Sequence, residues 1–183
     1  VTDMSNLFNG CSSLTDLPIQ DLETCNVVLA DSMFKGCSSL TILDMTGMDM
    51  TNAVDMDNIF AQCHSLDELH FPNTLTVMSL SRAFEGVGQQ ASYTTHVYGE
   101  LNTQNCEDMS YMFLDTRFFD YKFAENFNTR NLKNAEGLFA DCCVSEIDLS
   151  NWDMSKVETI EKMLRDFQTE KPTTIRCNLQ CMS

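Results

Sequence analysis

Basic residues are scarce in this chain of 183 residues, which has 11 lysines and arginines against 27 aspartates and glutamates. The formal net charge of −16 argues against direct nucleic-acid binding, because that function calls for a basic surface. It argues equally against attachment to an anionic membrane by charge. Two interpretations of the charge stay open: a well-solvated surface, or a surface that meets a basic partner.

Long hydrophobic runs are also missing. No stretch of the sequence approaches the roughly 20 consecutive apolar residues that a membrane-spanning helix needs, so we predict no direct membrane span. No segment has the pattern of a secretory signal peptide.

Motifs that carry chemistry are missing as well. The sequence has no glycine-rich phosphate loop, no G-x-S-x-G elbow and no zinc-binding helix motif. The three histidines are His64, His70 and His96. Cys63 and His64, with His70 nearby, resemble a nucleophile with a base, but we expect the Cys63 thiol to be buried and unreactive. We therefore predict a protein that is not an enzyme, with no catalytic residue, no metal site and no cofactor.

An internal repeat is the strongest signal that the sequence does contain. Seven anchor residues recur with steps of 26, 26, 24, 29, 26 and 25 residues, a period typical of repeat architectures. The anchors are Phe8, Phe34, Phe60, Phe84, Phe113, Phe139 and Leu164. Such a protein presents a long surface, so binding is the first functional expectation.

Apolar residues surround each anchor at offsets of −7, −4, −1 and +3, which trace one face of a helix. In the second repeat they are Val27, Ala30, Met33 and Cys37. We therefore predict a helix of about two to three turns in each repeat. The second half of a repeat instead shows strand-like alternation. Examples are Leu17-x-Ile19, Leu43-x-Met45, Leu69-x-Phe71 and Ile147-x-Leu149.

The amino-acid sequence of the repeat resembles that of a known family. Residues 1–14, Met33-Phe34-Lys35-Gly36-Cys37-Ser38-Ser39-Leu40 and the stretch from Ile147 to Ser155 are similar to the bacterial surface 26-residue repeat, a BspA-like leucine-rich repeat. The resemblance implies an α/β solenoid, a right-handed coil of about seven repeats of 24–29 residues. Short parallel strands would lie on one face and short helices on the other. It also implies a surface or adhesion role and a cell-surface or secreted location, with no family active site.

We expect one domain over residues 1–183, with a polar insertion at 85–98. The fifth repeat replaces leucines with aromatic residues. Because the first repeat has no polar capping unit before it, the chain is expected to be either an excerpt of a longer protein or a subunit whose ends are covered by neighbours.

The nine cysteines are an odd number. Cys11, Cys37, Cys63 and Cys142 hold the same place in their repeats, and we predict that they are buried structural thiols. Cys177 and Cys181 are the best disulfide candidates if the compartment is oxidising.

The outward positions of the predicted strands are the best candidates for function. Their carboxylates would stack a few ångströms apart and would be relieved by a cation or a basic partner, although they can equally serve solubility. The predicted partner-binding residues are the acidic strand face of Asp16, Asp44, Glu68, Glu146 and Asp148 and the aromatic cluster of Phe118, Phe119 and Tyr121.

Two functions follow from these observations. The first is a non-enzymatic protein–protein interaction module of the leucine-rich-repeat type, which binds a protein partner and not nucleic acid. The alternative is a structural subunit embedded in a large multiprotein assembly, such as one in an organelle, in which the aromatic residues are covered by neighbours.

Overall fold

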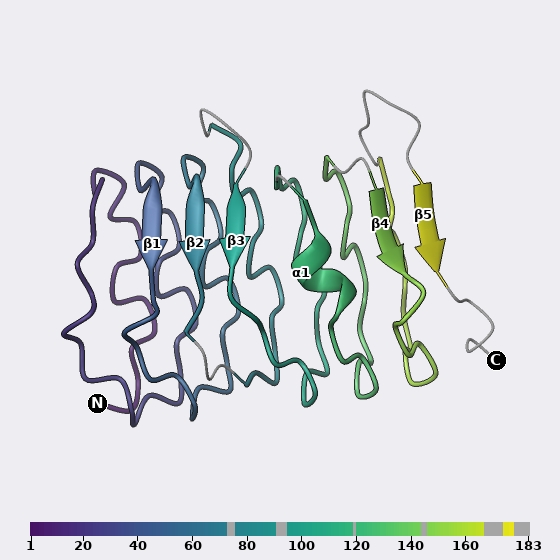
Figure 1. The fold of residues 1–183 in the computed structure, drawn as a ribbon, viewed down its shortest axis with the longest axis horizontal. Helices are drawn as coiled ribbons and strands as arrows, with labels where there is room; N and C mark the ends of the chain where they lie inside the picture. Colours follow the sequence, from purple (N-terminus) through teal and green to yellow (C-terminus); the bar gives the residue numbers. More distant parts are fainter. Residues whose placement is uncertain (73–75, 91–94, 119, 144–145, 167–173, 178–183) are drawn as a thin grey trace.

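The computed structural model describes residues 1–72, 76–90, 95–118, 120–143, 146–166 and 174–177. The chain turns back on itself repeatedly, so that segments roughly one sequence period apart lie side by side (Figure 1). Three short strands, β1 (Ile42–Asp44), β2 (Glu68–His70) and β3 (His96–Tyr98), form a parallel sheet in that order. A second parallel pair joins β4 (Glu146–Leu149) to β5 (Thr174–Cys177).

The predicted α/β leucine-rich-repeat solenoid, with a short helix in every repeat, is wrong. The described residues contain a single α-helix, α1 (Lys122–Glu125), and it lies outside all seven predicted helices. The segment around each anchor is a continuous run of turns instead. We call these runs turn segments 1 to 7, in the order of the seven anchors.

Each turn segment contains two residues with left-handed backbone dihedrals, which no α-helix can accommodate. They lie two residues before and two residues after the anchor. The first set is Asn6, Ser32, Asn58, Arg82, Tyr111, Gly137 and Lys162, and the second is Gly10, Gly36, Gln62, Gly86, Asp115, Asp141 and Asp166. Glycine and aspartate make up six of the seven residues in the second set, as expected for residues that tolerate positive φ.

Backbone hydrogen bonds in the turn segments alternate between two kinds of partner. In turn segment 1, the amides of Leu7, Asn9 and Cys11 donate to carbonyls three residues earlier, at 3.1–3.2 Å. The amides between them donate to turn segment 2, for example Phe8 N to Met33 O at 2.9 Å. Every second backbone amide of the segment, which in a helix would donate within the same helix, therefore donates to the neighbouring segment.

This pattern explains why the sequence suggested helices. The apolar offsets −7, −4 and −1 are three residues apart, and so are 0 and +3, which is the length of one hydrogen-bonded turn. A helix of 3.6 residues per turn buries the same positions over so short a stretch. Periodicity therefore identified the buried side chains, but it could not distinguish stacked turns from a helix.

Parallel bridges run across the segments at the first turn of each. They join Asp3 to Leu29, Leu29 to Asp55, Asp55 to Ser79, Ser79 to Asp108, Asp108 to Asn134 and Asn134 to Thr159. Strands β1, β2 and β4 include the alternating residues Leu43, Leu69 and Ile147, whereas Leu17 to Ile19 form no strand. Part of the predicted polar insertion at 85–98 also belongs to the sheet, as β3.

Five of the seven anchors form the centre of the core, whereas Phe8 is partly buried and Leu164 is 40% exposed. The rings of Phe34, Phe60, Phe84, Phe113 and Phe139 are at most 1% exposed. Successive rings lie 5.2–6.0 Å apart, from Phe8 to Phe139. Parallel and offset ring pairs of this kind contribute beyond the area that they bury.

The repeated cysteines line one side of this core. Cys37, Cys63 and Cys142 are buried, and the thiols of Cys37 and Cys63 donate to the Phe8 and Phe34 carbonyls at 3.3 and 3.2 Å. Burial raises the pKa of Cys37 to about 11 and that of Cys142 to about 12. These thiols are therefore packed and protonated, as structural cysteines are.

A thiol-labelling experiment checks this arrangement. In the native protein, a water-soluble disulfide reagent should modify exposed Cys25 at least about a hundred-fold faster than Cys37 or Cys142, because only thiolates react. Peptide mass mapping at successive times measures each rate, and labelling in denaturant is the control. Equal native rates would contradict the buried column.

Candidate functional site

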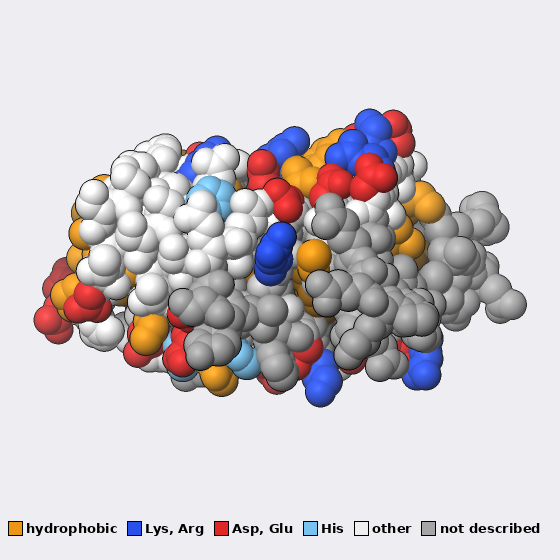
Figure 2. Space-filling model, turned by 90° about the horizontal axis from the view of Figure 1, so that it is seen from above, with side chains coloured by type: hydrophobic (Ala, Val, Ile, Leu, Met, Phe, Trp, Pro, Cys, Tyr) orange, Lys and Arg blue, Asp and Glu red, His pale blue; other side chains and the backbone are white. Residues whose placement is uncertain are grey.

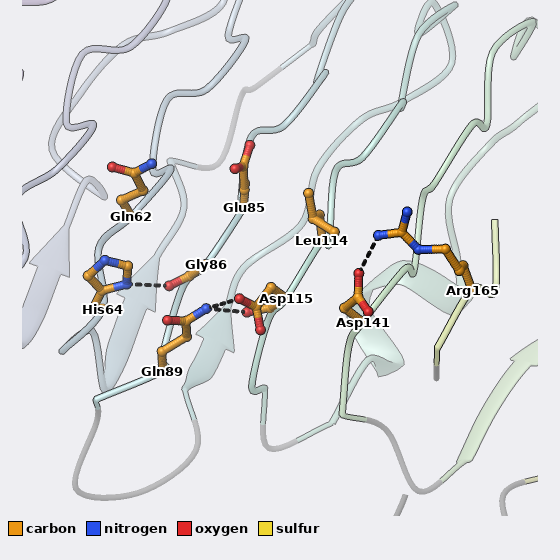
Figure 3. A pocket seen from close by; sticks show the side chains of 9 residues that line it. All are labelled: Gln62, His64, Glu85, Gly86, Gln89, Leu114, Asp115, Asp141 and Arg165. Atoms are coloured by element: carbon orange, nitrogen blue, oxygen red, sulfur yellow. Dashed lines mark hydrogen bonds and ion pairs between the residues drawn. The ribbon is translucent and has the colours of Figure 1, made fainter. Parts of the chain in front are cut away.

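A groove of about 690 Å³ runs across turn segments 3 to 7 (Figure 3). Its wall consists mainly of residues one or two places after the anchors, including Gln62, Glu85, Asp115 and Asp141. Because these residues repeat with the sequence period, their side chains follow one another along the groove. Figure 2 shows acidic and basic side chains gathered at the upper right of the molecule, beyond a largely uncharged surface.

Gly86 creates the depth of the groove. It occupies the second left-handed position of turn segment 4, where the segments on either side carry Gln62 and Asp115. The missing side chain leaves a gap between them. His64 Nδ1 donates to the Gly86 carbonyl at 2.9 Å, which assigns the proton of the neutral ring to Nδ1.

The groove carries more negative than positive charge. Glu85 pairs with Arg82 at 2.8 Å and Asp141 with Arg165 at 2.7 Å. Asp115 differs, because its carboxylate accepts a hydrogen bond from the neutral amide of Gln89 (Figure 3). Burial raises the pKa of Asp115 and the Gln89 hydrogen bond opposes this change. The charge of Asp141 raises the pKa further, whereas Arg117 and His64 lower it.

The predicted strand face is only partly assembled. Asp44 lies opposite His70 in the β1–β2 register, and His70 lies opposite Tyr98 in β3. His70 stacks on Tyr98 with ring centroids 4.5 Å apart, and its Nε2 lies 3.3 Å from Glu68 Oε2. The structure thus brings Asp44 and Glu68 onto one sheet surface, together with imidazole and phenol rings that the sequence reasoning left out of the site.

The other acidic residues lie elsewhere. Asp16 is exposed on a stretch that forms no strand, and Asp148 lies in β4 of the second sheet. The backbone of Glu146 belongs to β4, but its side chain lies outside the described residues. Glu68 has Ile42 and His96 as its register partners, so no acidic residue lies directly opposite it in the sheet of β1, β2 and β3.

Local hydrogen bonds occupy two of these carboxylates. Thr46 donates its hydroxyl and amide to Asp44, and these bonds lower the pKa of Asp44. Ser150 does the same for Asp148, where Arg176 adds a smaller effect. Each carboxylate therefore stabilises its own turn as well as facing solvent.

The predicted aromatic binding cluster is corrected by the structure. Phe118 is 3% exposed and Tyr121 is 1% exposed, and both pack against Phe113. Burial raises the pKa of Tyr121 well above its usual value, while its hydroxyl shares a hydrogen bond with Thr116 at 2.7 Å. These rings belong to the core and offer no surface to a partner. Phe119 lies outside the described residues.

The disulfide candidate is not resolved by the structure. Cys177 closes β5, but its side chain and all of Cys181 lie outside the described residues. The pairing stays a prediction.

The suspected nucleophile and base are not arranged for chemistry. Cys63 is buried, and burial raises the pKa of its thiol far above the usual value. Within the described ranges, no three His, Cys, Asp or Glu side chains gather as they would around a metal ion. That same part of the chain has no helix long and apolar enough to cross a membrane, as the sequence predicts.

Sequence reasoning missed the groove because it treated the turn segments as helices. The signal was present at the second position after each anchor, which is glycine in three segments (Gly10, Gly36 and Gly86) and polar in the other four. Glycine recurring inside a predicted helix indicates a backbone that needs positive φ.

A family model described as "Mycoplasma protein of unknown function, DUF285" matches the chain twice, over residues 1–96 and 78–173. No curated protein and no solved structure matches the chain.

Proposed function

Since the chain belongs to the DUF285 family of Mycoplasma proteins, whose description states no activity, we propose from its surface chemistry that it is a non-enzymatic protein-binding module. The sheet surface formed by β1, β2 and β3 is the proposed contact. The resemblance of the repeat sequences to bacterial surface repeats supports a role for this binding at a cell surface or in adhesion.

One observation carries the proposal. The rings of His70, Tyr98 and His96 lie nearly parallel on this surface, with the Tyr98 centroid 4.5 Å from that of His70 and 6.4 Å from that of His96. Tyr98 is 45% exposed and neighbouring Ile42 is 50% exposed. Exposed aromatic and aliphatic groups with polar neighbours are typical of protein interfaces.

The carboxylates indicate the kind of partner. Asp44 and Glu68 flank the rings, and the whole chain carries a net charge of −16. A partner with lysine or arginine side chains would gain favourable electrostatics and faster association, both reduced by salt.

A capture experiment tests the sheet surface. The double substitution Asp44→Lys and Glu68→Lys should reduce partner capture from the native source at least about ten-fold, because it places like charges opposite a basic partner. Quantitative mass spectrometry of the captured proteins, at two salt concentrations, gives the measurement.

The matched control is Asp21→Lys combined with Glu23→Lys, which makes the same change of charge at exposed residues outside the sheet. Capture that falls equally in both double variants would reject the sheet surface and leave only a general charge effect.

A structural subunit of a larger assembly is the second candidate. It is favoured by an exposed apolar strip beside the parallel bridges, where Val28, Leu29 and Met78 are 38%, 38% and 48% exposed. Val28 and Met78 hold the same position in turn segments 2 and 4, and contiguous exposed apolar surface is typical of surfaces covered by a neighbour. Light scattering that shows a well-behaved monomer would count against this candidate.

A further inference from the structure

We propose that the groove across turn segments 3 to 7 binds an arginine side chain of a partner protein. This site is separate from the sheet surface of the proposed function and rests on different residues. Two observations support the proposal together: the groove itself, and the fact that two of its three carboxylates pair with arginines while the third, Asp115, has a neutral donor.

The shape of the groove suits a side chain. Its volume of about 690 Å³ lies within the range typical of ligand pockets. Gly86 forms the floor, and a Cβ atom there would lie 3.4 Å from His64 Cε1 and 3.7 Å from Gln89 Nε2. Any larger residue would narrow the space between these two side chains, so the glycine keeps the groove open.

The ion pairing leaves one carboxylate available. Glu85 and Asp141 already have arginine partners, at 2.8 and 2.7 Å. Asp115 has a neutral donor, Gln89, and no salt bridge within the described residues. The negative charge of Asp141, on the next segment, raises the pKa of Asp115, whereas Arg117 and His64 lower it by smaller amounts. A bound cation would relieve the repulsion between these two carboxylates, of which Asp115 is exposed and Asp141 is half-buried.

The arrangement favours a guanidinium over an ammonium. Asp115 and Asp141 hold the same position on adjacent segments, which lie about 4.8 Å apart in a parallel ladder. The planar guanidinium has five donors and can bind the Asp115 carboxylate through two parallel hydrogen bonds, whereas the ammonium of lysine acts as a compact point charge. Leu114, also in the wall, offers apolar surface to the aliphatic part of an arginine side chain.

A peptide titration of the full chain tests the proposal. The probe is acetyl-Gly-Arg-Gly-amide, followed by amide shifts of the isotope-labelled protein. Matched peptides carry lysine or citrulline, the neutral analogue of arginine. We expect saturable shifts at Gly86, Gln89 and Asp115 with arginine, binding at least about three-fold weaker with lysine, and no saturation with citrulline.

Substitutions make the test specific. Asp115→Asn keeps the shape of the side chain and should weaken arginine binding about ten-fold, the loss expected for one charge-assisted hydrogen bond. Asp21→Asn removes an equal charge from an exposed site and should leave binding unchanged. Circular dichroism of both variants confirms that they are folded.

Three results would overturn the proposal: shifts spread evenly over acidic residues, equal affinity for arginine and lysine, or unchanged affinity in Asp115→Asn. The outcome is independent of the sheet surface, because Asp44→Lys with Glu68→Lys should leave this titration unaltered.

Discussion

Replacing Gly88 with alanine should destabilise the protein by about 2–5 kcal/mol, as the sum of backbone strain and overpacking. Gly88 has a φ of +77°, and a Cβ there would lie 2.8 Å from the Arg117 carbonyl oxygen and closer still to Thr95 Oγ1. The carbonyl belongs to the backbone and cannot rotate away. Denaturant unfolding followed by circular dichroism measures the loss.

Gly10→Ala is the matched control. Gly10 has nearly the same φ, +75°, but no atom lies within 4 Å of the Cβ position. This variant should lose only about 1 kcal/mol, because backbone strain acts without a clash. If both variants lost the same amount, the close packing around Gly88 would be contradicted.

Phe113→Ala should cost about 3–5 kcal/mol, the usual range for removing a buried phenylalanine. Phe113 is fully buried, stacks on Phe84 and Phe139 at 5.6 and 5.2 Å, and meets the edges of Phe118 and Tyr121. Its removal leaves a cavity at the point where the anchor column meets the aromatic run. The free energy of unfolding from urea titration gives the measurement.

Phe8→Ala makes the same chemical change at a less buried place. Phe8 is only partly buried and stacks on Phe34 in the segment beside it. We expect a smaller loss there, about 1–3 kcal/mol, because less apolar surface is removed from contact. A larger loss at Phe8 than at Phe113 would contradict the assignment of Phe113 to the centre of the core.

The sequence predicted the buried side chains well and the backbone poorly. The anchors Phe34, Phe60 and Phe84 and the thiols of Cys37 and Cys63 are buried where the repeat requires. The local backbone conformation depends on positive φ at residues such as Ser32, Tyr111 and Lys162, and the spacing of apolar residues does not encode these angles. Because these residue types carry no strong left-handed preference, only contacts between segments hold them there.

The candidate sites depended on pairing between distant segments. Asp44 and Glu68 were identified from alternation within each repeat, which the sheet preserves. The insertion could not be placed in this way, since β3 occupies the position beside β2 that a regular fourth repeat would have taken. The presence of Tyr98 and His96 on the sheet surface was therefore not predicted from the sequence. Predicting the groove would also have required knowing that Gly86 lies between Gln62 and Asp115, where its missing side chain leaves a gap.

The alternating hydrogen bonds of the turn segments have a consequence for how such genes can change in length. Each interior segment accepts bonds from the one before it and donates to the one after it, as turn segment 2 does with Met33 O and Phe34 N. Duplicating or deleting one whole period would restore every donor and acceptor at the new junction. Losing a single residue within a segment would misplace all of them, so viable insertions and deletions should occur in whole periods or in the connections between segments.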